Sequence, residues 1–364
     1  MTYGNYPPHD KIKKILVVKL RHLGDVLLST PVFSSIKKAL PSATVDVLIN
    51  QEAFPILSNN PYVDKVVLFD RKTKPRNFFS KLNCEFNFYF SIWKKKYDLV
   101  INLTDGDRAL LLTKLSRAKT LVGMQTDNKK INKKYTHLVK KCHLERHIVE
   151  KNLDAIRRIG IFPEYEERNL DFFYQKPPPD SRLLNLTKEE FILVHPTSRW
   201  RFKCWPEKKV VQLINRLCDM GRKVVVTSGP SIDEKLMVSR VMDKVNNKNV
   251  LNLSGQTSID DLAYLIHSCR ALVCVDSFPF HVASCFKKPV CALFGPTSNL
   301  TWGAWKNQNA EVISFDISCR PCFLDGCGGS KMSDCLNRIT VDRVVDTLTK
   351  ILERSNSLKV VTHH

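Results

Sequence analysis

The sequence has no long apolar run and no apolar leader. No stretch approaches the roughly 18 uninterrupted apolar residues of a membrane-spanning helix. The polar first residues, Met1 to Lys14, lack the apolar core of a secretory signal. We therefore expect a cytoplasmic protein.

Acidic residues are scarce relative to basic ones. The 364 residues include 57 Lys and Arg but only 36 Asp and Glu, a formal net charge of +21. This excess goes beyond what solubility requires and predicts a polyanionic partner: nucleic acid, an anionic membrane face or an acidic glycolipid. The sequence has no zinc-finger spacing, basic zipper or RNA-module aromatic signature, so no nucleic acid is expected.

A disulfide framework is also not indicated. The 12 cysteines are scattered, several of them in apparent core segments such as those around Cys274 and Cys291. Buried reduced thiols in a reducing compartment are the expectation.

The chain instead has an alternation of strand-like and helix-like segments. This rhythm predicts parallel sheets covered by helices, in an α/β protein with two doubly wound, Rossmann-like domains facing a cleft. The proline-rich stretch 175–180 reads as a linker, so we place the domains at 1–176 and 177–364. A last helix at about 340–354 could pack back on the first domain. The expected strands are 15–18, 44–49, 65–69, 99–103, 191–194, 223–227, 250–253, 272–275 and 290–293, and the expected helices include 26–39, 54–58, 76–95, 207–220, 234–245, 259–268 and 282–284.

Two segments of the second half follow predicted strands and suit a diphosphate. In one, Ser277 can cap a helix that contains Pro279, and a helix start offers unpaired N–H groups to an anion. In the other, Thr197, Ser198 and Arg199 are followed by Lys203, which together supply hydroxyls and cations. Either segment alone indicates only a helix start, but together they predict a nucleotide-diphosphate site.

A polar segment in the first half follows the first predicted strand. Gly24 permits close backbone approach, and Asp25 stands at the start of the next helix. Asp25 is either a helix N-cap or a general base that takes a proton from a hydroxyl.

Three segments carry a resemblance to a known family. They are Lys19 to Pro31, Thr197 to Pro206, and Asp276 to His281 followed by Phe294 to Thr297. They resemble the ADP-heptose:lipopolysaccharide heptosyltransferases, inverting glycosyltransferases with two Rossmann-like domains (GT-B). The sequences of residues 19–31, 45–48 and 149–160 are most similar to the heptosyltransferase III branch, which adds a heptose to heptose II of the inner core.

The resemblance implies a function and a set of site residues. ADP-heptose would be the donor, an anionic lipopolysaccharide core the acceptor, and no cofactor would be required; the enzyme would act peripherally at the cytoplasmic face of the inner membrane. Asp25 would be the catalytic base. The family usually has a small residue, often Gly or Ala, at the position where this chain has Phe278. Donor binding would fall to Thr197, Ser198, Arg199, Lys203, Asp233, Glu234, Thr257, Asp276, Ser277, Phe278 and His281. Separately, the basic excess of the first half is explained if basic residues there meet the phosphates and acidic sugars of the core, and the expected acceptor residues are Arg21, His22, Lys74, Arg76 and Lys119.

The acceptor step and the class of protein stay open at this point. The acceptor step could be of the heptosyltransferase I or II type, or the chain could be a non-catalytic polyanion-binding protein. A cluster of four cysteines has the ligand number of structural zinc, and the alternative is that they are reduced thiols that pack a loop. The four are Cys319, Cys322, Cys327 and Cys335. The segment 76–96 mixes aromatic residues and lysines, which suits either a helix on an anionic membrane or a helix packed on the sheet.

Overall fold

The chain folds into two compact units, residues 1–173 and 174–364. The computed structural model describes the backbone of residues 6–70, 78–104 and 107–361, and the side chains of residues 6–70, 86–104 and 109–355. The stretch 175–180, where a linker is expected, contains no helix or strand.

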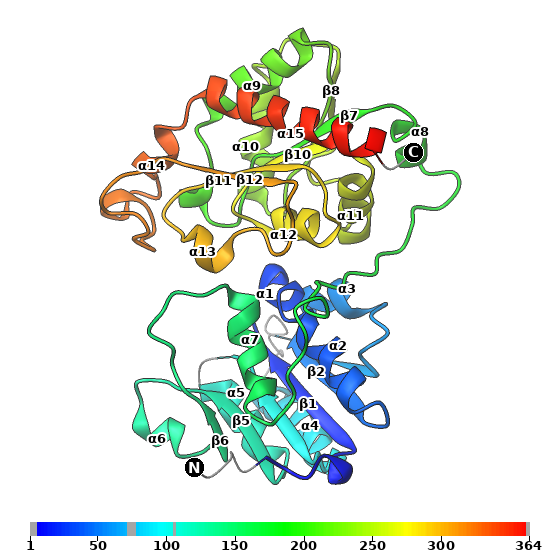
Figure 1. Ribbon diagram of the computed structural model, residues 1–364, viewed down its shortest axis with the longest axis vertical. Coiled ribbons are helices and arrows are strands. Elements are labelled where there is room, and N and C mark those ends of the chain that lie inside the picture. Colours follow the sequence, from blue (N-terminus) through cyan, green and yellow to red (C-terminus); the bar gives the residue numbers. More distant parts are fainter. Residues whose placement is uncertain (1–5, 71–77, 105–106, 362–364) are drawn as a thin grey trace. The chain divides into compact units, whose positions relative to one another are not determined.

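The first unit is built on a six-stranded parallel sheet of order β3-β2-β1-β4-β5-β6. Helices α4 and α5 cover one face of this sheet, and α2 and α7 pack together on the other (Figure 1). The chain order reverses between β1 and β4, which is the point where ligands bind in open α/β sheets. The elements are β1 (Lys14–Lys19), α1 (Leu23–Leu27), α2 (Thr30–Ala39), β2 (Thr44–Asn50), α3 (Phe54–Leu57), β3 (Lys65–Phe69), α4 (Phe78–Lys95), β4 (Leu99–Asn102), α5 (Asp107–Leu115), β5 (Thr120–Met124), α6 (Lys129–Asn132), β6 (His137–Val139) and α7 (Ile148–Arg157).

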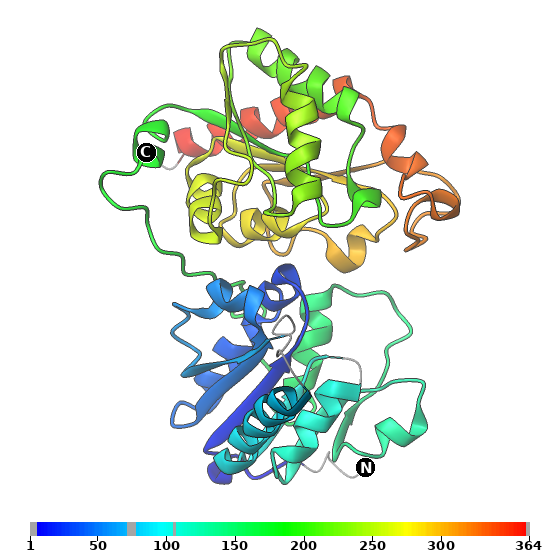
Figure 2. The same ribbon diagram turned by 180° about the vertical axis from the view of Figure 1, so that it is seen from behind.

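The second unit repeats this topology, with strand order β12-β11-β10-β7-β8-β9. Helices α9 and α15 lie on one face of its sheet, and α11 and α12 lie on the other (Figures 1 and 2). The reversal falls between β7 and β10. The elements are α8 (Arg182–Leu186), β7 (Phe191–His195), α9 (Glu207–Asp219), β8 (Lys223–Val226), α10 (Ile232–Met242), β9 (Val250–Asn252), α11 (Ile259–Ser268), β10 (Ala271–Val275), α12 (Phe278–Cys285), β11 (Val290–Phe294), α13 (Asn299–Trp302), β12 (Ala310–Ser314), α14 (Asp334–Asn337) and α15 (Val341–Val361).

The central strands are the uninterrupted apolar runs of the sequence. Every residue of β7, β10 and β11 is buried. Strands of a parallel sheet are covered on both faces, so they cannot alternate between apolar and polar residues as a half-exposed strand does. The two expected Rossmann-like, doubly wound halves of an α/β protein are thus confirmed.

The expected helix 26–39 is two helices, because Pro31 interrupts it. Proline has no N–H to donate to a carbonyl four residues earlier, so α2 starts anew with Pro31 in its first turn. The carbonyl of Leu27 accepts the hydroxyl of Thr30 instead, at 2.8 Å. The break leaves α1 as a single short turn that carries Asp25.

Helix α15 completes the second unit. Its apolar residues Val344, Leu348 and Ile351 are buried in one core with residues of α9, β10 and β11. The sequence left open whether this helix packs on the first domain. Its buried apolar face packs within the second unit. Within the described part of the chain, no helix is both long and apolar enough to cross a membrane.

Candidate functional site

The loop after β7 joins the loop after β8 through a buried carboxylate. Glu234, in the first turn of α10, accepts the hydroxyl of Thr197 at 3.0 Å and that of Ser231 at 2.8 Å. Gly229 lies so close that a Cβ there would come within 2.4 Å of the Glu234 oxygens. Glu234 therefore positions these loops, whereas the carboxylate of its neighbour Asp233 is exposed and remains available to a ligand.

A second buried carboxylate stands at the end of β10. Asp276 is 4% exposed and accepts the Lys203 ammonium at 2.7 Å and the Thr297 hydroxyl at 2.6 Å. Lys203 comes from the 3-10 helix η3 (Arg201–Lys203), which follows β7. The structure thus brings together two expected donor residues that are 73 positions apart, as an ion pair whose cation is partly screened by its own partner.

Helix α12 begins without a side-chain cap. Ser277 occupies the N-cap position, but its hydroxyl donates to the carbonyl of Val275 at 3.2 Å and makes no capping bond. The expected cap is therefore wrong in detail. In the first turn of α12, Pro279 has no N–H and the Phe280 N–H donates to the Ser277 carbonyl at 3.1 Å. This positive end of the helix dipole lies beside Asp276 at the end of β10, where the sheet order reverses.

The remaining expected donor residues are spread along the carboxyl edge of the second sheet. Phe278 opens α12 and is partly exposed, while His281 is buried with its ring 5.4 Å from that of Phe280. Arg199 is exposed in the loop after β7, and Ser198 beside it is buried. Thr257 is half-buried in the loop between β9 and α11.

His195, the last residue of β7, was not among the expected site residues. It is fully buried, and its Nδ1 lies 3.0 Å from the Thr227 hydroxyl at the end of β8. Burial lowers the pKa of His195 to about 4, so the ring is neutral at pH 7. The sequence signal that could have marked His195 as a site residue is its place at the end of a predicted buried strand, just before Pro196.

Asp25 lies in the first turn of α1, directly beyond the end of β1. Its carboxylate is half-buried and makes no hydrogen bond or ion pair with any described side chain. Below it, the buried Lys19 ammonium donates to the Leu103 carbonyl and to Asn152, each at 3.2 Å. The Leu20 N–H donates to the Thr104 hydroxyl at 2.8 Å. These bonds hold the loop that positions Asp25.

The expected acceptor residues are only partly brought together. Arg21 is exposed and His22 is the N-cap of α1, with Nδ1 3.6 Å from a Glu52 oxygen. Lys119 precedes β5 and thus lies at the amino edge of the sheet, about 15 Å of strand away from the edge that carries Asp25. Lys74 and Arg76 lie outside the described residues.

The four clustered cysteines do not form a metal centre in the described chain. No three His, Cys, Asp or Glu side chains among the described residues are arranged to hold a metal ion. Cys319 and Cys327 are exposed, whereas burial raises the pKa of Cys335.

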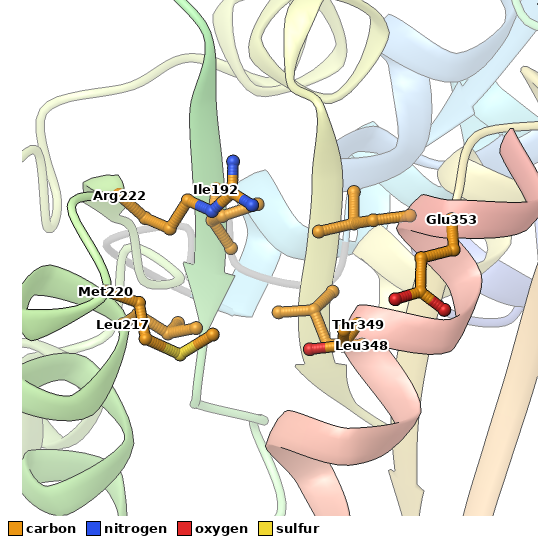
Figure 3. Close-up of a pocket in the computed structure, with 8 residues that line it drawn as sticks. Ile192, Leu217, Met220, Arg222, Leu348, Thr349 and Glu353 are labelled. Carbon is orange, nitrogen blue, oxygen red and sulfur yellow. The ribbon is translucent and has the colours of Figure 1, made fainter. Parts of the chain in front are cut away.

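Two cavities lie away from these residues. One of about 130 Å³ is lined by Ile192, Arg222 and Leu348, at the amino edge of the second sheet and beneath α15 (Figure 3). Another of about 480 Å³ lies beside α2 and includes Lys38 and Asp171, whose pKa is raised by burial. Neither contains a residue of the carboxyl edges just described.

Fold and site together define a class. The chain is an α/β protein of two doubly wound parallel sheets, each with polar side chains at its carboxyl edge, where open α/β sheets bind ligands.

The comparisons with known proteins give the family. Residues 87–332 match the model of glycosyltransferase family 9 (heptosyltransferase), so the chain belongs to this family of glycosyltransferase enzymes. It is 32% identical to lipopolysaccharide heptosyltransferase 3 of Escherichia coli K12, over 81% of this chain and 86% of the relative.

Solved structures agree on the fold. The structure of E. coli ADP-heptose lipopolysaccharide heptosyltransferase II aligns with a TM-score of 0.75 at 20% identity, covering 94% of this chain and 99% of that one. The E. coli heptosyltransferase WaaC with ADP aligns with a TM-score of 0.70 at 21% identity, covering 93% and 99%.

Proposed function

We propose that this enzyme transfers a heptosyl residue from ADP-heptose to the lipopolysaccharide inner core, adding heptose III to heptose II with inversion. The observation that carries the proposal is the similarity to lipopolysaccharide heptosyltransferase 3, which spans most of both chains. The reaction would take place peripherally at the cytoplasmic face of the inner membrane.

In this proposal the second unit holds the donor. The positive end of the α12 dipole and the Lys203 ammonium would bind the diphosphate, since both favour negative charge. The Thr197–Glu234–Ser231 chain of hydrogen bonds fixes the loop beside them, and the exposed Asp233 would accept from the ribose hydroxyls. Bonds formed before the ligand arrives reduce the ordering that binding requires.

Asp25 would then act as the general base. As the acceptor hydroxyl oxygen attacks the anomeric carbon, its proton passes to the Asp25 carboxylate. The bond from the anomeric carbon to the phosphate oxygen breaks, and ADP leaves with the electron pair. A carboxylate that no described side chain contacts suits this step, because each donor to its oxygens would stabilise the unprotonated form and weaken the base.

The test is a transfer assay with ADP-heptose and core acceptors that end at successive heptoses. Mass spectrometry should show one added heptose on the acceptor that carries heptose II, and none on acceptors that lack it. Addition to an acceptor with no heptose, or with only heptose I, would instead assign the enzyme to an earlier step. No product on any acceptor would contradict the proposal.

A further inference from the structure

Helix α4 is apolar on two faces. Its inner face packs on the sheet through Phe88, Tyr89 and Ile92, and Ile92 is 1% exposed. Its outer face carries Phe86, Phe90 and Trp93, which are 65%, 46% and 40% exposed. These three residues, called here the outer stripe, are spaced at i, i+4 and i+7 and therefore lie along one line of the helix. A helix packed only on the sheet has no need of a second apolar line.

The rings of the outer stripe are ordered against one another. Phe86 and Phe90 stack with centroids 6.0 Å apart, and Phe90 and Trp93 stack at 5.4 Å. The guanidinium of Arg117, which follows the neighbouring helix α5, lies 5.0 Å over the Trp93 ring. A surface already held in one arrangement loses little side-chain freedom when something covers it.

The surroundings of the outer stripe are basic. Residues 86–104 and 109–119 contain six basic residues, all exposed, and a single acidic residue, Asp98. The backbone N–H groups of Lys13 and Lys14 both donate to Asp98, so its charge is locally engaged. The basic residues are Lys94, Lys95, Lys96, Lys114, Arg117 and Lys119. Of these, Lys95 lies 3.5 Å from Asp46, which is buried in the sheet.

We propose that the outer stripe of α4 docks on an anionic lipid bilayer. The aromatic rings would enter the boundary between headgroups and acyl chains, and the surrounding basic residues would lie over the headgroup phosphates. A line of aromatic side chains edged with lysine and arginine is the composition of interfacial helices, and the charge complements anionic lipid. The inference rests on the proposed function only in that a glycolipid acceptor gives the enzyme a reason to reach a membrane.

The experiment compares the full-length protein with the variant Phe86→Gln, Phe90→Gln, Trp93→Gln. Glutamine favours helix and the three positions are exposed, so folding should persist, which circular dichroism checks. A matched control replaces three other exposed apolar residues of the same unit by glutamine: Leu144, Phe162 and Tyr165, which are 75%, 62% and 54% exposed. Sedimentation with phosphatidylglycerol and phosphatidylethanolamine vesicles, against phosphatidylcholine vesicles, measures binding.

The native chain and the control should bind the anionic vesicles alike, and the stripe variant at least about tenfold more weakly. Replacing Lys94 and Lys96 by glutamine should weaken binding by about fivefold per lysine. Equal binding by the stripe variant, or no binding by the native chain, would overturn the proposal. One further result would overturn it: a native chain that is dimeric and binds no vesicles, with a stripe variant that is monomeric. The stripe would then join two copies of the chain.

The outcome is separable from the enzymatic proposal. Transfer to a detergent-dispersed acceptor should be the same for the native chain and the stripe variant. The stripe lies on the outer face of α4, toward the helix end that leads into the amino end of β4, whereas Asp25 follows the carboxyl end of β1. A native chain that binds vesicles but transfers nothing would remove the proposed function and leave the docking surface standing.

Discussion

The two units have the same strand order but prepare their reversal points differently. Between β7 and β10, two carboxylates are buried and saturated, Glu234 by two hydroxyls and Asp276 by Lys203 and Thr297. Between β1 and β4, the loop is fastened from below by Lys19 and Thr104, while Asp25 receives no bond from a described side chain. In the function that we propose, one topology thus serves as a cradle for an anion in the second unit and carries a carboxylate that takes a proton in the first.

The difference is sharpest at Asp25. Asp25→Asn keeps the shape of the side chain but removes the base, so turnover should fall by about a hundredfold or more while ADP affinity stays unchanged. Steady-state kinetics and calorimetry measure the two. Asp127→Asn, at an exposed position of the same unit, is the control and should behave as the native chain. Native turnover in Asp25→Asn would make the two reversal points alike in having no catalytic base.

Acid should destabilise the second unit through His195. Because its folded pKa of about 4 lies below the ordinary 6.5, the stability that neutral His195 contributes is complete above pH 6.5 and is lost progressively as pH falls toward 4. The shift corresponds to about 3 kcal/mol over that interval. Denaturant titrations of His195→Gln at pH 7 and pH 4 should show a loss smaller by about this amount. His143→Gln, at an exposed position of the first unit, should leave the native loss unchanged.

Lys203 tests whether the cradle binds the donor. Lys203→Ala should weaken ADP binding by about tenfold or more and leave the acceptor KM unchanged, since a charge-assisted bond to phosphate is lost. The unfolding free energy should also fall, because Asp276 is left buried without its cation. Lys223→Ala removes a partly exposed lysine paired with Glu189 on the same unit and is the control. Unchanged ADP affinity in calorimetry would show that Lys203 serves only Asp276.

A smaller difference between the two units is expected in how ionic strength affects acceptor and donor binding. We expect the acceptor KM to rise a few-fold between low and physiological ionic strength, because exposed basic residues of the first unit meet an anionic core in solvent. Donor affinity should change less, since the pair Lys203 and Asp276 is largely enclosed. Equal salt dependence of the two constants would contradict this assignment.

The sequence predicted the parts of the fold that depend on local pattern. Continuous apolar runs identify the central strands, as at 191–194 and 272–275. Strands β5, β6 and β12 were not predicted, because they are short or only half-buried and their place depends on pairing with a neighbour. In one place an alternation typical of a strand lies in helix α4, at Phe86, Phe88, Phe90 and Ile92. The alternation arises because both the packed face and the exposed face of this helix carry apolar residues.

The candidate site was predicted as a set of residues but not as a set of bonds. Residues Lys203 and Asp276 were each assigned to the donor from their own segments, and nothing in either segment shows that they pair across the sheet. The two hydrogen bonds to Glu234 could not be predicted either, because their donors, Thr197 and Ser231, come from different loops. Lys119 was placed with the acceptor by its charge, and only the direction of β5 shows that it lies at the opposite edge.

The position of α15 has a consequence for how the chain is made. All six strands of the first unit and α7 are complete once Arg157 has left the ribosome, so that unit can fold while synthesis continues. In the second unit, residues 344–352 of α15 supply part of the core over β10 and β11. Those strands must wait with apolar surface uncovered until α15 emerges. A ribosome that stalls between residues 315 and 340 would therefore present a finished first unit attached to an aggregation-prone second one, a natural target for chaperones.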